Sequence, residues 1–80
     1  MPSTKKSRAS QTKVDWVGVG RRIRELRGFD MTQGDFARRI GVSQNYLSMM
    51  ERGHVEIGAE IVLKISREFS KSMEWLLTGE

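Results

Sequence analysis

The chain has 80 residues, a formal net charge of +4 and no cysteine. A chain of this length suits one small domain, which buries roughly 60% of the surface that the unfolded chain exposes. The lack of cysteine excludes disulfides and thiolate metal sites, so an apolar core must supply the stability. The longest apolar runs are three residues, as in Ile61 to Leu63, which excludes a membrane-spanning helix and a signal peptide within the sequence. We expect a soluble, cytoplasmic protein.

The first residues differ from the rest of the chain in charge. Residues 1–14 contain four basic side chains and no acidic one, whereas the remaining 66 residues carry ten of each sign. The segment is polar and has no apolar periodicity, which is typical of a flexible terminus. We therefore expect a flexible basic arm over residues 1–13 and one folded domain over residues 14–80.

The first predicted helix follows this arm. Asp15 is a suitable N-cap, and an apolar stripe with helical spacing follows it. The stripe consists of Trp16, Val19, Ile23 and Leu26. Gly28 suits the position just beyond the helix end, and the basic Arg24 and Arg27 suit the negative end of the helix dipole. The pattern predicts a helix that runs to about Arg27.

A second helix is predicted to begin after Thr32. Thr32 and Asp35 have the spacing of a capping box, in which Thr32 accepts from the amide of Asp35 and the Asp35 carboxylate reaches back. The inward face consists of Phe36, Ala37 and Ile40. On the exposed side, Arg38 and Arg39 are expected to form charge pairs with Asp35. Gly41 ends the helix, because a residue without a Cβ adopts the sharp turn at little cost.

A third helix follows almost at once. Ser43 can cap it, and Leu47 and Met50 form its apolar face. Two helices joined by about three residues must cross steeply, which brings Ala37 close to the turn. The small side chain, the turn glycine and the paired caps together favour a DNA-binding helix-turn-helix motif over residues 32–53. The alternative is an ordinary pair of packed helices in a small bundle.

Two further helices complete the predicted fold. Residues 59–69 continue an apolar stripe that begins in the preceding loop, and Ser72 can cap a short final helix. The stripe consists of Ile57, Ile61, Ile65 and Phe69, with Val62 beside it. No segment has the alternating pattern of a strand. The predicted fold class is therefore all-α, a compact bundle of five helices.

Five sequence blocks, in this order and with these gaps, resemble the lambda-repressor-like (Xre/Cro-type) helix-turn-helix regulators. The blocks are residues 20–27 (GRRIRELR), 31–37 (MTQGDFA), 40–48 (IGVSQNYLS), 51–53 (ERG) and 75–79 (WLLTG). The resemblance covers about residues 17–79. Gly34 departs from the family, which more often has a charged residue there, and Ile57 stands where a proline is common. The resemblance implies a transcriptional regulator that binds DNA, and we expect it to be a repressor.

The third predicted helix supplies the expected base contacts. A helix in the major groove reads base edges with side chains of its N-terminal half that the core does not use. These side chains are Gln44, Asn45, Ser48 and Met49. The amide of Gln44 matches N6 and N7 of adenine, Asn45 can do the same or contact a phosphate, and Met49 could touch a thymine methyl group. The alternative is that these side chains are simply solvated.

The expected contacts with the DNA backbone are Gln33, Ser43, Tyr46 and Arg52. Gln33 begins the second helix, where its amide and side chain can meet a phosphate at the positive end of the helix dipole. The resemblance implies that Gln33 also braces Gln44. Capping explains Ser43 equally well, and Tyr46 could instead cover Phe36. Arg52 either clamps a phosphate or interacts with the last carbonyls of its own helix.

The arm and the C-terminal helices offer further contacts. Lys5, Lys6 and Arg8 either wrap the duplex and read an A·T-rich minor groove, or add only non-specific attraction. One domain makes few base contacts, so we expect a homodimer on a palindromic operator whose half-sites lie about one turn (~34 Å) apart. The candidates for the dimer surface are Leu63, Trp75, Leu76 and Leu77.

The sequence contains few of the residues and motifs that enzymes use for catalysis. His54 is the only histidine and there is no cysteine, and no phosphate loop or nucleophile motif occurs. We therefore expect no catalytic residue, no metal, no cofactor and no small-molecule ligand. The remaining rival is a protein-interaction module, such as an antitoxin, in which the polar face of the third helix binds another protein.

Overall fold

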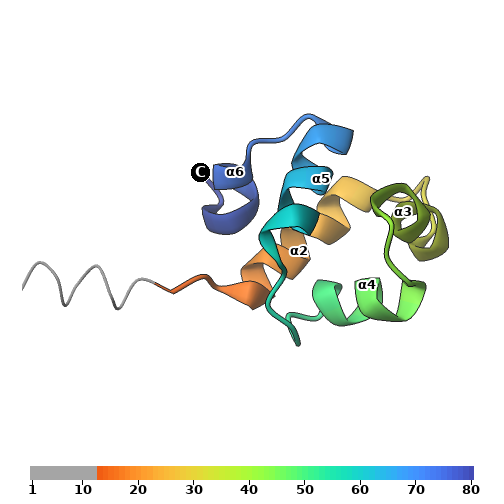
Figure 1. The fold of residues 1–80 in the computed structure, drawn as a ribbon, viewed down its shortest axis with the longest axis horizontal. Coiled ribbons are helices and arrows are strands. Elements are labelled where there is room, and N and C mark those ends of the chain that lie inside the picture. The colour runs from red at the N-terminus through yellow and green to blue at the C-terminus, as the bar shows by residue number, and fades with distance from the viewer. Residues whose placement is uncertain (1–12) are drawn as a thin grey trace, which may run out of the picture.

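The computed structural model describes residues 13–80, which form a bundle of five helices (Figure 1). The helices are α2 (Trp16–Arg27), α3 (Gln33–Ile40), α4 (Gln44–Glu51), α5 (Ala59–Phe69) and α6 (Met73–Thr78). The predicted all-α class and the predicted order of helices are confirmed. Lys5, Lys6 and Arg8 of the predicted arm lie outside the described residues. None of the helices between residues 13 and 80 is both long and apolar enough to cross a lipid bilayer.

All the described helices except α5 begin at a residue whose side chain caps the helix. The capping residues accept a hydrogen bond from the backbone amide three residues later, at 2.9 to 3.2 Å. They are Asp15, Thr32, Ser43 and Ser72. Each bond satisfies one of the N–H groups that have no partner within the helix. These four caps were predicted from the sequence, and they fix where each helix begins.

The charged side chains of α3 differ in part from the prediction. Arg38 pairs with Asp35, as expected, and the Asp35 carboxylate is thereby turned to Arg38 instead of completing the capping box. The predicted pairing of Arg39 with Asp35 is wrong. The Arg39 guanidinium lies 5.6 Å from the ring centroid of Phe69, which is itself stacked on Phe36 with centroids 4.6 Å apart. Arg39 therefore covers the aromatic pair that joins α3 to α5.

The apolar core draws residues from every helix. Its buried members are Val19, Ile23, Phe36, Ala37, Ile40, Leu47, Met50, Ile57, Val62, Ile65 and Leu76. The structure corrects one of the residues expected at a dimer surface: Leu76 is 1% exposed, so its side chain is committed to the core of its own chain. Trp75 and Leu77 are half-buried, and Leu63 is exposed.

Two glycines, Gly20 in α2 and Gly53 after α4, lie where the end of α4 meets α2. A Cβ on Gly20 would overlap the carbonyl oxygens of Met50 and Glu51, at the end of α4. A Cβ on Gly53 would lie 2.6 Å from the Cα of Val17. These neighbours are backbone atoms, which cannot turn aside as a side chain can. Glycine at both positions therefore lets the end of α4 rest directly on α2.

We predict that Gly20→Ala destabilises the domain, because the added methyl group must push α2 and α4 apart. Overpacking of this kind costs about 1–3 kcal/mol, and urea unfolding measures it. The matched control is Gly34→Ala. A Cβ on Gly34 meets nothing closer than Oε1 of Gln44, at 3.5 Å, so this change should be neutral or stabilise the helix by up to roughly 1 kcal/mol. Equal unfolding midpoints for the two variants would contradict the close approach.

Candidate nucleic-acid interface

α4 lies at the edge of the bundle, on the side away from α6 (Figure 1). Its apolar side chains Leu47 and Met50 are 0% exposed and belong to the core. The predicted base-contact residues are the ones that the core leaves at the surface. Gln44 and Asn45 are exposed, and Ser48 and Met49 are half-buried. The two amide side chains therefore stand at the exposed N-terminal end of α4.

The turn between α3 and α4 determines how α4 is presented. Gly41 adopts a left-handed conformation with φ 78° and ψ 29°. The Val42 amide donates to the Ala37 carbonyl at 3.0 Å, and Ser43 caps α4 immediately afterwards. Ala37 is 2% exposed at this crossing. The turn has the geometry expected from its glycine, its small residue and its second cap.

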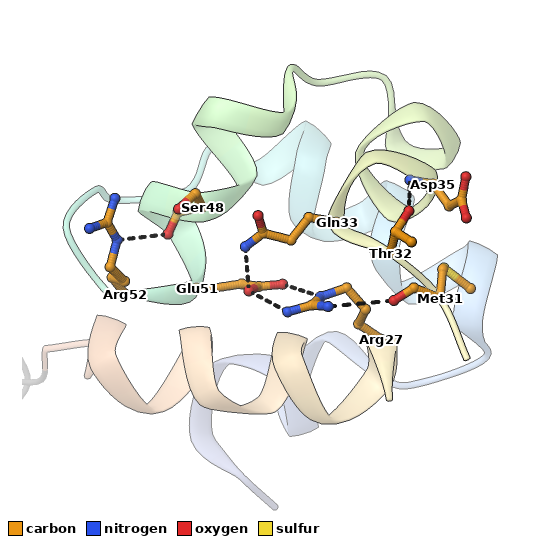
Figure 2. Close-up of polar contacts among 8 residues, drawn as sticks. All are labelled: Arg27, Met31, Thr32, Gln33, Asp35, Ser48, Glu51 and Arg52. Atoms are coloured by element: carbon orange, nitrogen blue, oxygen red, sulfur yellow. Dashed lines mark hydrogen bonds and ion pairs between the residues drawn. The ribbon is translucent and has the colours of Figure 1, made fainter. Parts of the chain in front are cut away.

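An ion pair joins the end of α4 to α2, and a hydrogen bond joins the start of α3 to the same carboxylate (Figure 2). Nε of Arg27 donates to Oε2 of Glu51 at 2.7 Å, and its Nη2 donates to Oε1 at 3.0 Å. Nε2 of Gln33 donates to the same Oε1 at 2.9 Å. The Glu51 side chain is only 3% exposed. A buried carboxylate is tolerated here because three N–H groups from two other helices satisfy it.

The partnership with Glu51 raises the pKa of Arg27 above its usual value: the hydrogen bond to Glu51 has the largest effect, burial opposes it, and the carboxylate charge adds a smaller rise. The guanidinium is thus a fixed positive charge. From its sequence position, Arg27 was expected only to suit the helix dipole, and no role was expected for Glu51. A signal was available: Glu51 is in phase with Leu47 and Met50, so an acidic residue occupies the inward face of α4.

The side chain of Gln33 has a partner that the sequence did not predict. Its amide nitrogen is bound to Glu51, whereas the resemblance implied that the side chain braces Gln44. Oε1 of Gln44 lies over Gly34 instead, where a Cβ would be 3.5 Å away. The backbone of Gln33 still begins α3, so the positive end of the helix dipole is at this position.

The other residues predicted to contact the DNA backbone are Ser43, Tyr46 and Arg52. Their side chains differ in how far they are already engaged within the protein. The Ser43 hydroxyl is engaged as the cap of α4. Tyr46 is partly buried against the core. Arg52 is exposed, and its Nε donates to the Ser48 carbonyl at 3.4 Å (Figure 2). That bond is the interaction with the end of its own helix that the sequence allowed, and it leaves the terminal nitrogens of Arg52 at the surface.

Among the described residues, the acidic side chains and the histidine do not form a metal-binding cluster. Within residues 13–80, no group of three or more His, Cys, Asp or Glu side chains could hold a metal ion. His54 is exposed in the loop that follows α4.

Comparison with known families matches residues 21–76 to the helix-turn-helix family. The chain belongs to this family, in its lambda-repressor-like form. Residues 21–76 form a DNA-binding helix-turn-helix domain of the transcriptional-regulator type, which is a non-enzymatic family. A similar solved structure is the P22 c2 repressor protein in complex with the synthetic operator 9T in the presence of Tl+. The TM-score is 0.72 with 30% identity, over 86% of this chain and 100% of the other.

Two curated relatives are longer than this chain. The propionyl-CoA carboxylase regulator of Cereibacter sphaeroides is 40% identical over 63 residues, which cover 78% of this chain and 14% of the regulator. Antitoxin PezA of Streptococcus pneumoniae is 38% identical over 55 residues, which cover 68% of this chain and 35% of PezA. The likeness to both proteins is therefore confined to a part of each, and this chain spans well under half of their length.

We predict that Glu51→Ala destabilises the domain by about 3 kcal/mol, because it leaves the partly buried Arg27 guanidinium without its partner. Urea unfolding provides the measurement. Glu68→Ala is the matched control, since Glu68 is also near the end of its helix but is exposed. Its effect should stay within about 0.5 kcal/mol. Similar losses for the two glutamates would show that the buried pair does not hold α4 in place.

Proposed function

We propose that this regulator represses transcription by inserting α4 into the major groove of a palindromic operator as a homodimer. The observation that supports this most directly is the division of α4 into two faces. Leu47 and Met50 belong to the core, while Gln44 and Asn45 are exposed at the helix start and lie outside the core. A short helix anchored at its end and exposed at its start suits the depth and width of the groove.

The side chains of α4 suit a direct reading of bases. Gln44 has both a donor and an acceptor, which match N7 and N6 of adenine, and Asn45 has the same pair on a shorter stem. Ser48 can donate to or accept from a base edge one turn later. Met49 is half-buried, so its exposed part suits contact with a thymine methyl group rather than a hydrogen bond. These four residues would carry sequence preference.

Contacts with the sugar-phosphate backbone would set the position of α4 in the groove. The start of α3 at Gln33 offers backbone N–H groups and the positive end of a helix dipole. Ser43, Tyr46 and Arg52 border the same face. We propose that Lys5, Lys6 and Arg8 of the arm add phosphate contacts beyond the helix-turn-helix motif.

A homodimer would double the few contacts that one domain makes. With Leu76 committed to the core, the predicted dimer residues that remain at the surface are Leu63, Trp75 and Leu77. Self-association through them would place two copies of α4 on half-sites about one helical turn apart (~34 Å). Occupation of such an operator would exclude other proteins from it, which is the simplest route to repression.

Selection of bound sites from random duplexes tests the proposal for α4. Gln44→Ala should weaken binding to the selected site by about 1–3 kcal/mol and relax the preference at one base position. The control is Lys64→Ala, on the exposed face of α5, which should leave affinity and preference unchanged. A loss that is equal on every duplex would mean that Gln44 contributes no base recognition.

Sedimentation of the free protein and of its complex with a palindromic duplex tests the dimer. We expect two chains on the duplex, and we expect Leu63→Arg to reduce the cooperativity of binding while leaving affinity for an isolated half-site unchanged. The side chain of Leu63 is apolar and exposed. Its removal from water in a dimer would favour association, and association of two chains would make their binding cooperative. A single chain both in solution and on the palindrome would exclude this arrangement.

The likeness to antitoxin PezA favours one second candidate, in which the main partner of the domain is another protein. The two functions differ in their response to salt and competitor DNA. Sequence-specific binding survives an excess of non-specific duplex and weakens steadily with salt. Failure to retain any duplex under competition would favour the protein partner.

A further inference from the structure

The side chain of Gln44 lies against the start of α3. Its Oε1 atom is 3.5 Å from the position that a Cβ of Gly34 would occupy, and the hydroxyl oxygen of Thr32 is 3.8 Å from the same position. Gln44 is the first residue of α4, and Gly34 is in the first turn of α3. This contact therefore links the beginnings of the two helices of the motif, and it bears on which end of the Gln44 amide faces outward.

The start of α3 is rich in hydrogen-bond donors. The first backbone bond of the helix runs from the Phe36 amide to the Thr32 carbonyl, so the amides of Gln33 and Gly34 have no partner within the helix. The Thr32 hydroxyl oxygen accepts from the Asp35 amide, which leaves the hydroxyl hydrogen to donate elsewhere. These donors and the positive end of the helix dipole favour an oxygen atom beside Gly34 and disfavour an NH2 group.

The orientation of the Gln44 amide follows from this environment. With Oε1 turned to α3, the NH2 group faces away from α3, and the side chain as a whole is exposed. An amide held in this way presents N–H donors and no acceptor. Guanine offers two acceptors, N7 and O6, in the major groove, whereas adenine offers N7 beside an amino group that is itself a donor. The outward NH2 group therefore complements guanine and opposes the amino group of adenine.

We infer that Gly34 is a positioning residue that makes Gln44 select guanine in preference to adenine. This inference rests on the proposed insertion of α4 into the major groove, and it narrows the base that Gln44 reads. An amide that turned freely would suit adenine, whereas an amide held by α3 suits guanine. Gly34 allows the arrangement because a longer side chain there would fill the space beside Oε1 or give the amide a different partner.

Selection of bound sites from random duplexes, compared between the wild type and Gln44→Ala, locates the base pair that Gln44 reads. We expect a G·C pair there, and its replacement by A·T should weaken wild-type binding about tenfold. Replacement of that guanine by 7-deazaguanine, which lacks the N7 acceptor, should also weaken wild-type binding. The same replacement should leave the binding of Gln44→Ala unchanged, because the donor that met N7 is already gone.

Gly34→Glu and Gly34→Lys form a matched pair, since both place a long side chain beside Gln44 but differ in hydrogen-bonding character. The glutamate accepts, so it should bind the NH2 group of Gln44, turn the carbonyl oxygen outward and move the preference from guanine to a base with an amino group, adenine or cytosine. The lysine donates, so it should hold Oε1 in place and keep the preference for guanine.

The preference between bases is the quantity to compare, because the added charge changes affinity for every duplex alike. Gly34→Ala is the control: its Cβ would make only an ordinary contact with Oε1, at 3.5 Å, so it should keep the preference for guanine. Thermal unfolding of the three variants checks that each is folded.

Two results would overturn the inference and leave the proposed function intact. In one, the wild type selects an A·T pair at the position that Gln44 reads, so that both ends of the amide face the base. In the other, Gly34→Glu and Gly34→Lys have the same base preference, so that the side chain at position 34 does not orient Gln44. A wild-type protein that binds no duplex selectively would instead reject the proposed function, and this inference with it.

Discussion

A buried carboxylate at the junction of three helices is the constraint on which the presentation of α4 depends. Glu51 ends α4, and its oxygens are bound by Arg27 from α2 and by Gln33 from α3. Burial of an ion without partners is costly, whereas a bidentate guanidinium and an amide together restore most of what water supplied. Each of these bonds is directional, so α4 cannot slide or turn against its neighbours without leaving a charge unsatisfied. The register of the helix-turn-helix motif is therefore tied to α2, which lies outside it.

The close contact at Gly20 acts on the same end of α4. There the carbonyl oxygens of Met50 and Glu51 lie against α2 so closely that no Cβ fits. The C-terminal end of α4 is thus held by packing and by charge at once, while its N-terminal end carries the exposed amides of Gln44 and Asn45. In the proposed complex, a helix that is held at one end and open at the other would lose little conformational freedom on binding. The fold positions these two side chains before any ligand is present.

Local patterns predicted the helices well because their causes are local. The caps at Thr32 and Ser43 are bonds between residues three positions apart, and such bonds are visible in a short stretch of sequence. The ion pair of Arg27 with Glu51 joins residues 24 positions apart, and the crossing of α2 and α4 decides it. For the same reason the sequence placed Leu76 at a surface and Arg39 beside Asp35. In both cases a partner on another helix, the core for Leu76 and Phe69 for Arg39, determined the outcome.

The buried carboxylate also determines what Gln33 can offer to a ligand. A carboxylate accepts hydrogen bonds and donates none, so the Gln33 amide must turn its NH2 group toward Glu51, as the bond of 2.9 Å shows. Its carbonyl oxygen then points away from Glu51 (Figure 2). An outward acceptor repels phosphate oxygens and suits an N–H donor. In the proposed complex, the groups that attract the DNA backbone would therefore be the N–H groups at the start of α3 and guanidinium groups. The Gln33 oxygen would be left to accept from an amide donor. Different atoms of the same few residues would then attract the DNA backbone and recognise the bases.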